Sequence, residues 1–388
     1  MNSPRSDRII YFDNAATTYP KPQSVLSSVF DCMQNYCGNA GRGSHPLAMR
    51  SAEVVYNARE SVASLFGGEP ENVIFTLNTT HALNTAIKGI MGRGGHVLIS
   101  NMEHNSTLRP VARLAADKNI RYDIFKAYDR QKSLTPKEIL ADITSRLRPD
   151  TKAIICIHSS NICSYSLPIH EIGQFCRRHG IVFIVDAAQS AGHIPINVVD
   201  DCIDVLCMPA HKGLYSPQGV GIMILRRGLR IDTLIEGGNG VNSLELGMGN
   251  STPERYEGGT LCLPAIAGLC QGIEFVRQIG IENIASHEKR LWMRAFEQLS
   301  TIRKSKIYDV NNQGSVMLFN IDGISPDTLG ELLSAKGFCL RTGYHCAALA
   351  HKTLGTIDRG GVRIGFGIFN TESEVDALCA EIAAITKI

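Results

Sequence analysis

Apolar runs of strand length alternate with amphipathic stretches between about residues 71 and 227. The runs are rich in β-branched residues and predict strands, while the stretches between them have helical spacing. Because the runs are apolar almost without interruption, we expect each strand to be buried on both faces. Such burial is typical of a mainly parallel sheet covered by helices, so the pattern predicts an α/β fold. The runs fall at 72–75, 96–100, 153–157, 181–185, 204–206 and 220–225.

The pattern changes beyond this region. Residues 237–260 are rich in glycine and lack periodicity, which predicts a functional loop, and helical spacing returns at 264–279. A second α/β unit then follows. It has predicted strands at 316–319 and 362–364, a helix at 325–336 and a last helix that begins at capping residues 371–374.

This change divides the chain into two predicted domains, as expected for a length of 388 residues. We predict a large domain at 20–265. The small domain is expected to combine residues 1–19 with residues 266–388.

Composition narrows the class of protein. Apolar residues make up 44% of the chain, charged residues 20%, and the formal net charge is +2. These values argue against a disordered chain and give no electrostatic basis for binding nucleic acid. No apolar run approaches the length of a membrane-spanning helix, and the N-terminus lacks the apolar segment of a signal peptide. We therefore expect a soluble, cytoplasmic protein that binds neither nucleic acid nor membrane.

Cysteine and histidine each occur 12 times, but their spacing does not indicate a metal site. Neither a Cys-x-x-Cys nor a His-Glu-x-x-His motif is present, and the cysteines are scattered from Cys32 to Cys379. No metal is predicted. In a reducing compartment most of these thiols would be small buried apolar groups.

Polar residues gather directly after five of the predicted strands. Ligands of parallel α/β sheets bind at the carboxyl ends of strands, so these residues are expected to meet in one pocket. Loops are polar in general, which would also place polar residues there. The segments are 79–81, 103–105, 159–161, 186–189 and 211–212.

Asp186 and Lys212 are expected at adjacent strand ends, one strand-helix-strand step apart. A carboxylate after a buried strand needs a cationic or donor partner, and a protonated pyridine nitrogen fits. A lysine in a dry pocket near another cation has a lowered pKa, and its free amine can condense with an aldehyde. Taken singly, Asp186 could instead cap a helix and Lys212 could be a solvated surface residue.

Two further groups suit the same pocket. Thr79 and Thr80 precede a helix-like stretch, so their hydroxyls and free backbone N–H groups would face an anion such as a phosphate. Simple capping of that helix explains them nearly as well. His104 could lie flat on a cofactor ring and move protons, or it could be a solvated loop residue.

Several short motifs occur in a specific order along nearly the whole chain. They are YFDNAATT (11–18), RGSH (42–45), TT (79–80), MEH (102–104), DAAQ (186–189), HKG (211–213), GGT (258–260), RTGYHC (341–346) and NT (370–371). With these motifs the chain resembles fold-type I, class V aminotransferase-like enzymes, and specifically group II cysteine desulfurases and their selenocysteine lyase relatives. The resemblance implies a seven-stranded, mainly parallel sheet in the large domain, pyridoxal 5'-phosphate as cofactor and a homodimer.

The resemblance also implies a role for each site residue. Lys212 would hold the cofactor as a Schiff base, Asp186 would pair with its pyridine nitrogen and His104 would stack on its ring. Gln189 would bond the phenolic oxygen. The phosphate ligands would be Thr79, Thr80, His211 and, from the second subunit, Thr260. The substrate ligands would be Asn161, Arg341, His45 and Arg363, the last gripping a carboxylate with a bidentate fork.

Cys346 ends the RTGYHC motif. Taken alone it would be one packing cysteine among the 12. The resemblance makes it a nucleophile whose thiolate takes the sulfur of L-cysteine, leaving L-alanine and a persulfide, with a sulfur-acceptor protein as a further partner. Three alternatives stay open: selenocysteine lyase activity on L-selenocysteine, aminotransferase or epimerase chemistry without a persulfide, and a non-catalytic scaffold.

The chain departs from the family pattern near the expected site. Pro209 stands where a hydroxyl residue usually helps to hold the phosphate, and Gly365 stands in place of a serine. Ser164 and Tyr165 replace a Gly-Thr pair. Histidines common in the family are replaced by Asn105 and Tyr344. These changes indicate a divergent subgroup in which cofactor binding survives better than substrate identity.

Overall fold

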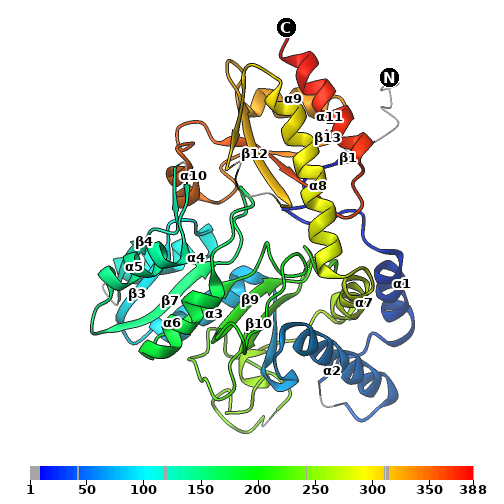
Figure 1. Cartoon of the computed structure of the whole chain (residues 1–388). Coiled ribbons are helices and arrows are strands. Elements are labelled where there is room, and N and C mark those ends of the chain that lie inside the picture. Colours follow the sequence, from blue (N-terminus) through cyan, green and yellow to red (C-terminus); the bar gives the residue numbers. More distant parts are fainter. Residues whose placement is uncertain are drawn as a thin grey trace.

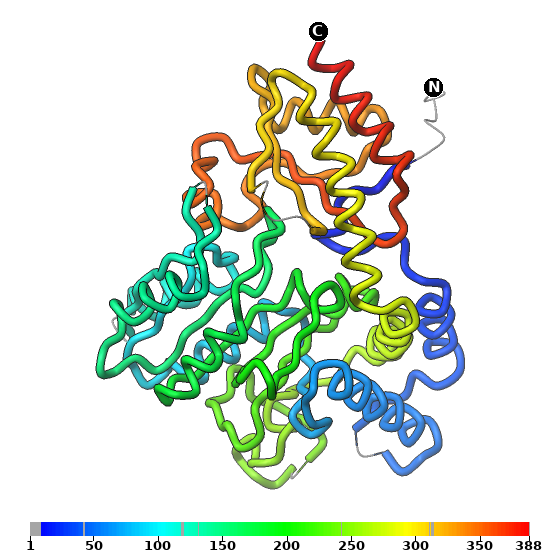
Figure 2. Tube along the Cα trace, viewed as in Figure 1, coloured from blue at the N-terminus to red at the C-terminus, as the bar shows by residue number. Residues whose placement is uncertain are grey.

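The computed structural model describes residues 9–41, 43–117, 120–130, 132–241, 243–309, 311 and 314–387. Arg42 of the RGSH motif and residues 1–8 of the predicted small domain lie outside the described residues. The chain forms a larger body around a seven-stranded sheet and a smaller body around a four-stranded sheet (Figure 1). Figure 2 shows that the smaller body is built from the last part of the chain, coloured yellow to red, together with a blue segment near the N-terminus.

Seven strands form the larger sheet. They are β2 (Val73–Thr76), β3 (Gly95–Ser100), β4 (Ile120–Phe125), β7 (Thr151–Ile157), β8 (Val182–Asp186), β9 (Val205–Pro209) and β10 (Gly221–Leu225). Their order across the sheet is β2-β10-β9-β8-β7-β3-β4. β10 runs antiparallel to both of its neighbours, and all other pairs are parallel. The prediction of a mainly parallel seven-stranded sheet is confirmed.

Alternate side chains of these strands enter two apolar cores, one on each face of the sheet. In β3, Leu98 belongs to the first core and Val97 to the second, and in β7 Ile154 and Ile155 divide in the same way. Burial on both faces explains why these strands are continuous apolar runs in the sequence. The first core includes side chains of α2 (Pro46–Phe66), α5 (Pro136–Arg146), α6 (Ile169–His179) and α7 (Leu263–Ile279). The second includes side chains of α3 (Thr79–Met91) and α4 (Asn105–Ala116).

The remaining elements of the larger body are short. α1 packs against α7 at the edge of the first core, and β5 and β6 form a small hairpin. None of the helices among the described residues has the length and apolar character needed to cross a bilayer. These elements are α1 (Gln23–Asp31), the π-helical turn η1 (Cys32–Tyr36), the 3₁₀ turns η2 (Pro70–Asn72) and η3 (Glu254–Tyr256), β5 (Tyr128–Asp129) and β6 (Lys132–Ser133).

The smaller body has its own sheet and its own core. The sheet order is β11-β12-β15-β14, and the core combines Phe12 with apolar residues between 291 and 385. Thr371 and Glu374 form the predicted capping box at the start of the last helix. The elements are β11 (Ser305–Tyr308), β12 (Val316–Ile321), β14 (Arg341–Gly343), β15 (Gly361–Gly365), α8 (Ile281–Ser300), α9 (Pro326–Ser334), α10 (Ala348–Leu354), α11 (Glu372–Ile385) and the parallel pair β1 (Ile10–Tyr11) and β13 (Phe338–Cys339).

The packing of α7 and α8 bears on where the two domains meet. Ile266 and Ile273 of α7 lie in a core of the larger body, whereas Trp292 of α8 lies in the core of the smaller one. Gly280 separates the two helices at a positive φ of 88°. We therefore propose Gly280 as the domain boundary, in place of the predicted boundary at 266.

Two features of the larger sheet differ from the prediction. The edge strand β4 was not expected because most of its positions are polar or only partly buried. The segment between β8 and β9 contains turns instead of the expected helix. Gly192 in this segment has a φ of 83° and packs so closely on Gly213 that a Cβ would lie 2.1 Å from the carbonyl oxygen of Gly213. This contact and the positive φ hold the segment in a non-helical path.

Candidate active site

The carboxyl ends of β2, β3, β7, β8 and β9 open into a single cavity. β2 runs in the same direction as β9 because both pair antiparallel with β10. All five of the polar segments that follow these strands contribute to the cavity wall. The lining residues are Asn78, Thr79, Thr80, His104, Ser106, Ile157, Asn161, Asp186, Ala188, Gln189, Pro209, His211 and Lys212.

Lys212 places an amine in this cavity. Its side chain is half-buried, and no hydrogen bond or ion pair of Nζ occurs within the described part of the chain. Burial, with added repulsion from Arg363, lowers the pKa of Lys212 to about 8, although Asp186 opposes this shift. With a pKa of about 8, about a tenth of the amine is free of its proton at pH 7, far more than at the ordinary lysine pKa of 10.5, as a nucleophilic lysine requires.

Asp186 ends β8 as a buried carboxylate. Its Oδ1 accepts a hydrogen bond of 2.9 Å from the N–H of Ala188, and no helix follows, so Asp186 does not cap a helix. Burial raises the pKa of Asp186 to about 6. A carboxylate held this deep with so little compensation is suited to a cationic ligand group.

The N-terminus of α3 forms an anion cradle. Asn78 caps the helix by accepting from the N–H of His81 at 2.9 Å. Thr80 Oγ1 lies 2.8 Å from Ser106 Oγ, whereas Thr79 Oγ1 is buried without a hydrogen-bond partner among the described residues. A helix N-terminus also carries free N–H groups and positive potential. An unpaired buried hydroxyl beside such a terminus fits a phosphate.

His104 lies beside this cradle as the N-cap of α4. Its Nδ1 accepts from the N–H of Ser106 at 3.1 Å, so the proton of the neutral ring is on Nε2. Burial and the charge of Lys212 lower the pKa of His104 to about 4. The ring is therefore neutral at physiological pH.

Glu103, for which no role was predicted from the sequence, precedes His104 and is held by β3 and β7. It is fully buried and accepts from the N–H of Ile157 at 2.8 Å and from the hydroxyl of Ser100. Burial raises the pKa of Glu103 to about 8. This carboxyl group joins β3 to β7 just beneath the cavity.

The N-terminal segment 13–21 braces two more of the predicted cofactor residues. Gln189 donates through Nε2 to the carbonyl of Ala15 at 2.9 Å. His211 Nδ1 lies 3.0 Å from Thr17 Oγ1, and burial and Lys212 lower the pKa of His211 to about 4. Both side chains therefore line the cavity in a fixed orientation.

Arg363 and Asn161, two predicted substrate ligands, connect the two bodies at the cavity. Arg363 is buried, pairs with Asp13 Oδ1 at 2.7 Å and donates to the carbonyl of Asn161 at 3.0 Å. Asn161 Nδ2 in turn donates to the carbonyl of His345 at 2.7 Å. Asn161 Oδ1 and Arg363 Nε are buried and have no partner in the described ranges, so both keep hydrogen-bonding capacity for a ligand.

Arg341 lies on β14 directly opposite Arg363 on β15. Unlike Arg363, it is exposed, and it makes no ion pair with the described residues. Its charge still reaches the site, because it contributes to the lowered pKa values of Lys212 and His104.

Cys346 lies in a strained turn outside the cavity lining. It is exposed, and both His345 and Cys346 have positive φ, at 50° and 55°. Non-glycine residues in this region cost about 1–3 kcal/mol each, and such strain persists where the surroundings hold it. The carbonyl of Cys346 accepts from the N–H of Asn105 at 2.8 Å. Because Asn105 follows His104, this bond docks the cysteine turn beside the cavity.

A comparison with protein families places this site in context. The aminotransferase class-V family matches residues 10–378. The chain belongs to this family. A probable cysteine desulfurase of Methanothermobacter thermautotrophicus is 31% identical over 379 residues, which cover 95% of this chain and 92% of that protein. A probable cysteine desulfurase of Halalkalibacterium halodurans is 29% identical over 381 residues, 95% of this chain and 91% of that protein.

A solved structure agrees with the family. The apo structure of cysteine desulfurase from Thermococcus onnurineus NA1 has a TM-score of 0.91 and 28% identity, and the match covers 100% of this chain and 99% of that one. Class V proteins use pyridoxal phosphate, and this cavity offers a matching group for each part of it. The α3 terminus fits the phosphate, Asp186 the ring nitrogen and Lys212 the aldehyde.

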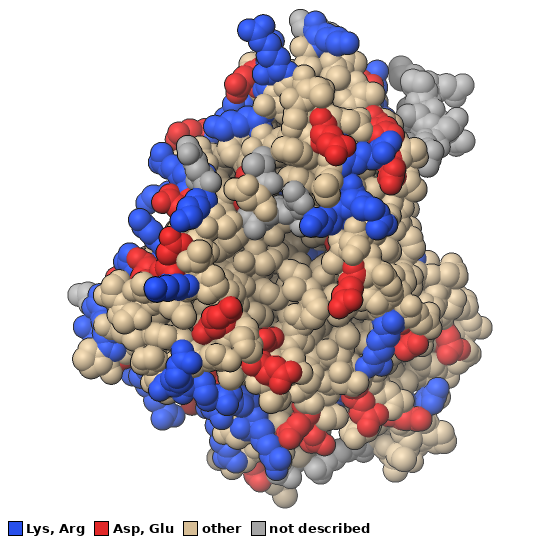
Figure 3. Space-filling view, in the orientation of Figure 1, with Lys and Arg blue, Asp and Glu red and all other residues tan. Residues whose placement is uncertain are grey.

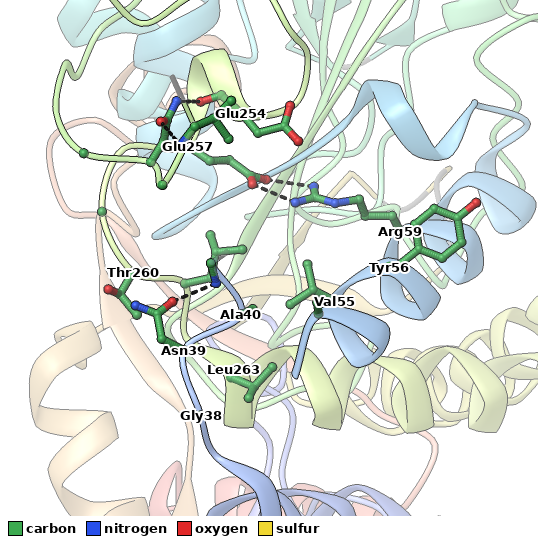
Figure 4. Close-up of a pocket in the computed structure, with 18 of the residues that line it drawn as sticks. Gly38, Asn39, Ala40, Val55, Tyr56, Arg59, Glu254, Glu257, Thr260 and Leu263 are labelled. Carbon is green, nitrogen blue, oxygen red and sulfur yellow. Dashed lines mark hydrogen bonds and ion pairs between the residues drawn. The ribbon is translucent and has the colours of Figure 1, made fainter. Parts of the chain in front are cut away.

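Two predicted class V site residues lie elsewhere in the single chain. Thr260 lines a separate cavity of about 630 Å³ (Figure 4), which also contains Asn39 and the bidentate Arg59–Glu257 ion pair. His45 is exposed and caps α2 by accepting from the N–H of Ala48. One copy of the chain therefore does not bring Thr260 or His45 to Lys212.

Gly365, one departure from the family pattern, has a steric cause. The carbonyl of Gly365 accepts from Asn14 Nδ2 at 2.9 Å, so the N-terminal segment lies directly against β15. A Cβ at Gly365 would be 2.7 Å from the backbone nitrogen of Ala15. A side chain at this position would force the segment away from β15.

Ser164 and Tyr165, two further departures, fasten the loop that carries Asn161. Ser164 Oγ donates to the carbonyl of Val316 at 2.8 Å and accepts from its N–H at 3.1 Å, joining the loop to β12 of the smaller body. Tyr165 donates to the carbonyl of Ala127 and packs against Tyr128, with 4.9 Å between ring centroids.

We predict that Ser164→Ala lowers the free energy of unfolding by about 1–2 kcal/mol, because both bonds to Val316 are lost. Urea denaturation measures the change. Ser145→Ala, at an exposed helix position, is the matched control and should shift stability by less than about 0.5 kcal/mol. Equal stability of the two variants would show that Ser164 does not fasten the loop.

Proposed function

We propose that this class V protein is a pyridoxal phosphate-dependent cysteine desulfurase. It would convert L-cysteine to L-alanine and leave the sulfur as a persulfide on Cys346. The observation that carries the proposal is the joint geometry of the cavity and the cysteine turn. Lys212, Asp186 and the α3 terminus line one cavity, and the turn with Cys346 is docked on Asn105 at its side.

The cavity residues would hold the cofactor at both ends. Thr79, Thr80 and His211 would bind its phosphate, Gln189 its phenolic oxygen, and His104 would stack on its ring through a neutral imidazole. The bound cofactor supplies an electron sink for bond cleavage in the amino-acid substrate. Asp186 would keep the ring nitrogen protonated, which the cofactor needs for that role. Lys212 would bind the aldehyde and, with a pKa of about 8, later hold or release a proton near the substrate.

The substrate would be anchored where the two bodies meet. Arg363 would bind the substrate carboxylate, because its Nε is unpaired beside the ion pair with Asp13, and Arg341, which has no ion pair in the described chain, would add a second positive charge. Asn161 Oδ1 offers an unused acceptor to the substrate. Cys346 Sγ would then take the sulfur as a persulfide, which divides one difficult step into two.

A second copy of the chain would complete the site. Thr260 is remote from Lys212 within one chain, so a phosphate contact by Thr260 requires a homodimer. The loop that precedes Thr260 is suited to an interface, because Leu244 and Leu246 are fully exposed. A sulfur-acceptor protein would take the persulfide from the exposed Cys346.

Product analysis tests the function. Purified protein supplied with pyridoxal phosphate and L-cysteine should form alanine together with sulfide once a reducing thiol is added. Transfer of the amino group to a keto acid with no release of sulfur would instead identify an aminotransferase.

We expect the apoprotein to capture pyridoxal phosphate faster as the pH rises through about 8, because the free amine of Lys212 is the reacting species. Without burial the rate would rise only near the ordinary lysine pKa, close to 10.5. Stopped-flow absorbance at a series of pH values gives the midpoint. In Asp186→Asn the midpoint should move to lower pH, because the carboxylate that favours the ammonium is gone. A midpoint near 10 in the wild type would rule out a perturbed Lys212.

A further inference from the structure

A line of three buried polar side chains runs behind Cys346. His345, which precedes Cys346, has 5% of its surface exposed, His351 has none and Thr356 has 1%. His345 Nε2 lies 3.2 Å from the carbonyl oxygen of Arg341, and His345 Nδ1 lies 3.5 Å from His351 Nε2. His351 Nδ1 lies 2.7 Å from Thr356 Oγ1. The two imidazole rings are nearly parallel, with an interplanar angle of 16°.

The carbonyl at one end of this line sets the direction of its hydrogen bonds. A carbonyl can only accept, so His345 Nε2 carries the proton and His345 Nδ1 is an acceptor. His351 must therefore donate from Nε2, which makes its Nδ1 an acceptor for the Thr356 hydroxyl; this hydroxyl also lies 3.3 Å from the carbonyl oxygen of His351. Each of the three contacts then has one donor and one acceptor when both rings are neutral.

The surroundings keep both rings neutral. Burial and the charges of Arg363 and Arg341 lower the pKa of His345 to about 3. Burial lowers the pKa of His351 to about 4, against the carbonyl of Tyr344, which favours the charged ring. A proton added to His345 Nδ1 would place two N–H donors opposite each other, because His351 Nε2 also carries a proton. The hydrogen bond between the two rings therefore requires both to be neutral.

The line acts on the backbone that carries the sulfur. The carbonyl of His345 is held by Asn161 and the carbonyl of Cys346 by Asn105, and both residues adopt positive φ. The ring of His345 is a further anchor of this turn, and it is held between the carbonyl of Arg341 and the side chain of His351.

We infer that His351 is a positioning residue for Cys346. Through its Nε2 proton it fixes the tautomer and place of His345, and thereby the left-handed turn that presents the sulfur atom. This inference rests on the proposed function only in giving Cys346 its chemical role; the mechanical link between His351 and the turn stands on the contacts alone.

Two substitutions at His351 distinguish a role in positioning the cysteine turn from a role in packing alone. His351→Gln keeps an N–H donor at the place of Nε2, whereas His351→Leu removes it with similar bulk. Hydrogen exchange of the Asn105 amide, which donates to Cys346, reports directly on docking of the turn. In His351→Leu we expect this amide to exchange about ten-fold faster or more, and in His351→Gln within about three-fold of the wild type. The amide of Ile157, bound to Glu103, is the internal reference and should not change.

Thr356→Val gives a third measurement if His351→Leu does not fold. Loss of the donor to His351 Nδ1 should speed exchange at Asn105 by about two- to five-fold. Unchanged exchange in Thr356→Val, or equal exchange in the Gln and Leu variants, would overturn the inference.

Turnover of L-cysteine supplies the functional readout. We expect His351→Leu to lower kcat by about ten-fold with a smaller change in KM, because His351 contacts the cysteine turn and not the substrate anchors themselves, and His351→Gln to recover most of kcat. An equal loss of kcat in the Gln and Leu variants would count against positioning. If the wild type forms no persulfide, the proposed function fails, while the exchange contrast at Asn105 still decides the role of His351.

Discussion

Lys212→Ala is expected to abolish covalent capture of pyridoxal phosphate and to lower turnover of L-cysteine by about a thousandfold or more. The reason is that Lys212 is the amine that lines the cavity opposite Asp186, and its lowered pKa makes it reactive near neutral pH. Borohydride reduction of the wild-type protein with the cofactor, followed by peptide mapping, should place the label on Lys212.

Lys21 is the internal control for this experiment. Burial also lowers the pKa of Lys21 to about 8, but its ammonium donates to Thr18 Oγ1 and to the carbonyl of His211, and it does not line the cavity. Label on Lys21, or undiminished label in Lys212→Ala, would contradict the assignment of Lys212.

Cys346→Ala is expected to reduce sulfur release from L-cysteine by about a hundredfold or more while cofactor binding stays normal. The cofactor should be unaffected because Cys346 lies outside the cavity lining, and its contact with Asn105 uses the backbone carbonyl. The measurement combines visible absorbance of the bound cofactor with sulfide and alanine assays.

The matched control for Cys346→Ala is Cys262→Ala, which removes another exposed thiol outside both cavities. It should retain wild-type turnover. Full sulfur release by Cys346→Ala would rule out a persulfide on Cys346 and would favour chemistry that needs no thiol, such as a selenocysteine lyase can use.

The sequence was sufficient to predict the central strands and less informative about the edges. β3, β7 and β8 are buried on both faces, so their apolar runs were visible without any structure. β4 lies at the sheet edge, where Arg121 is exposed, Asp123 is only half-buried and the strand signal is weak. The turns between β8 and β9 depend on the contact of Gly192 with Gly213, which joins segments distant in sequence.

The sequence likewise predicted only part of the site. The positions of Asp186 and Lys212 after two predicted strands indicated that the two side chains would lie close together, because neighbouring parallel strands end at the same edge of the sheet. The unpaired state of Thr79 Oγ1 and the ion pair of Arg363 with Asp13 depend on packing of the N-terminal segment and could not be derived from spacing. The contact of His345 with His351 needed the positive-φ turn, which no local sequence signal indicated. Roles for Thr260 and His45 stay predictions, because they require a second copy of the chain.

The most direct test of a cysteine desulfurase is the fate of the sulfur. The protein loaded with pyridoxal phosphate is given L-cysteine or L-selenocysteine, alanine is quantified, and the peptide that contains Cys346 is weighed by mass spectrometry without reductant. We predict alanine from L-cysteine in an amount that matches the sulfur recovered, and a Cys346 peptide heavier by one sulfur atom. Alanine from L-selenocysteine alone, or turnover of L-cysteine that leaves Cys346 unmodified, would contradict the proposed function.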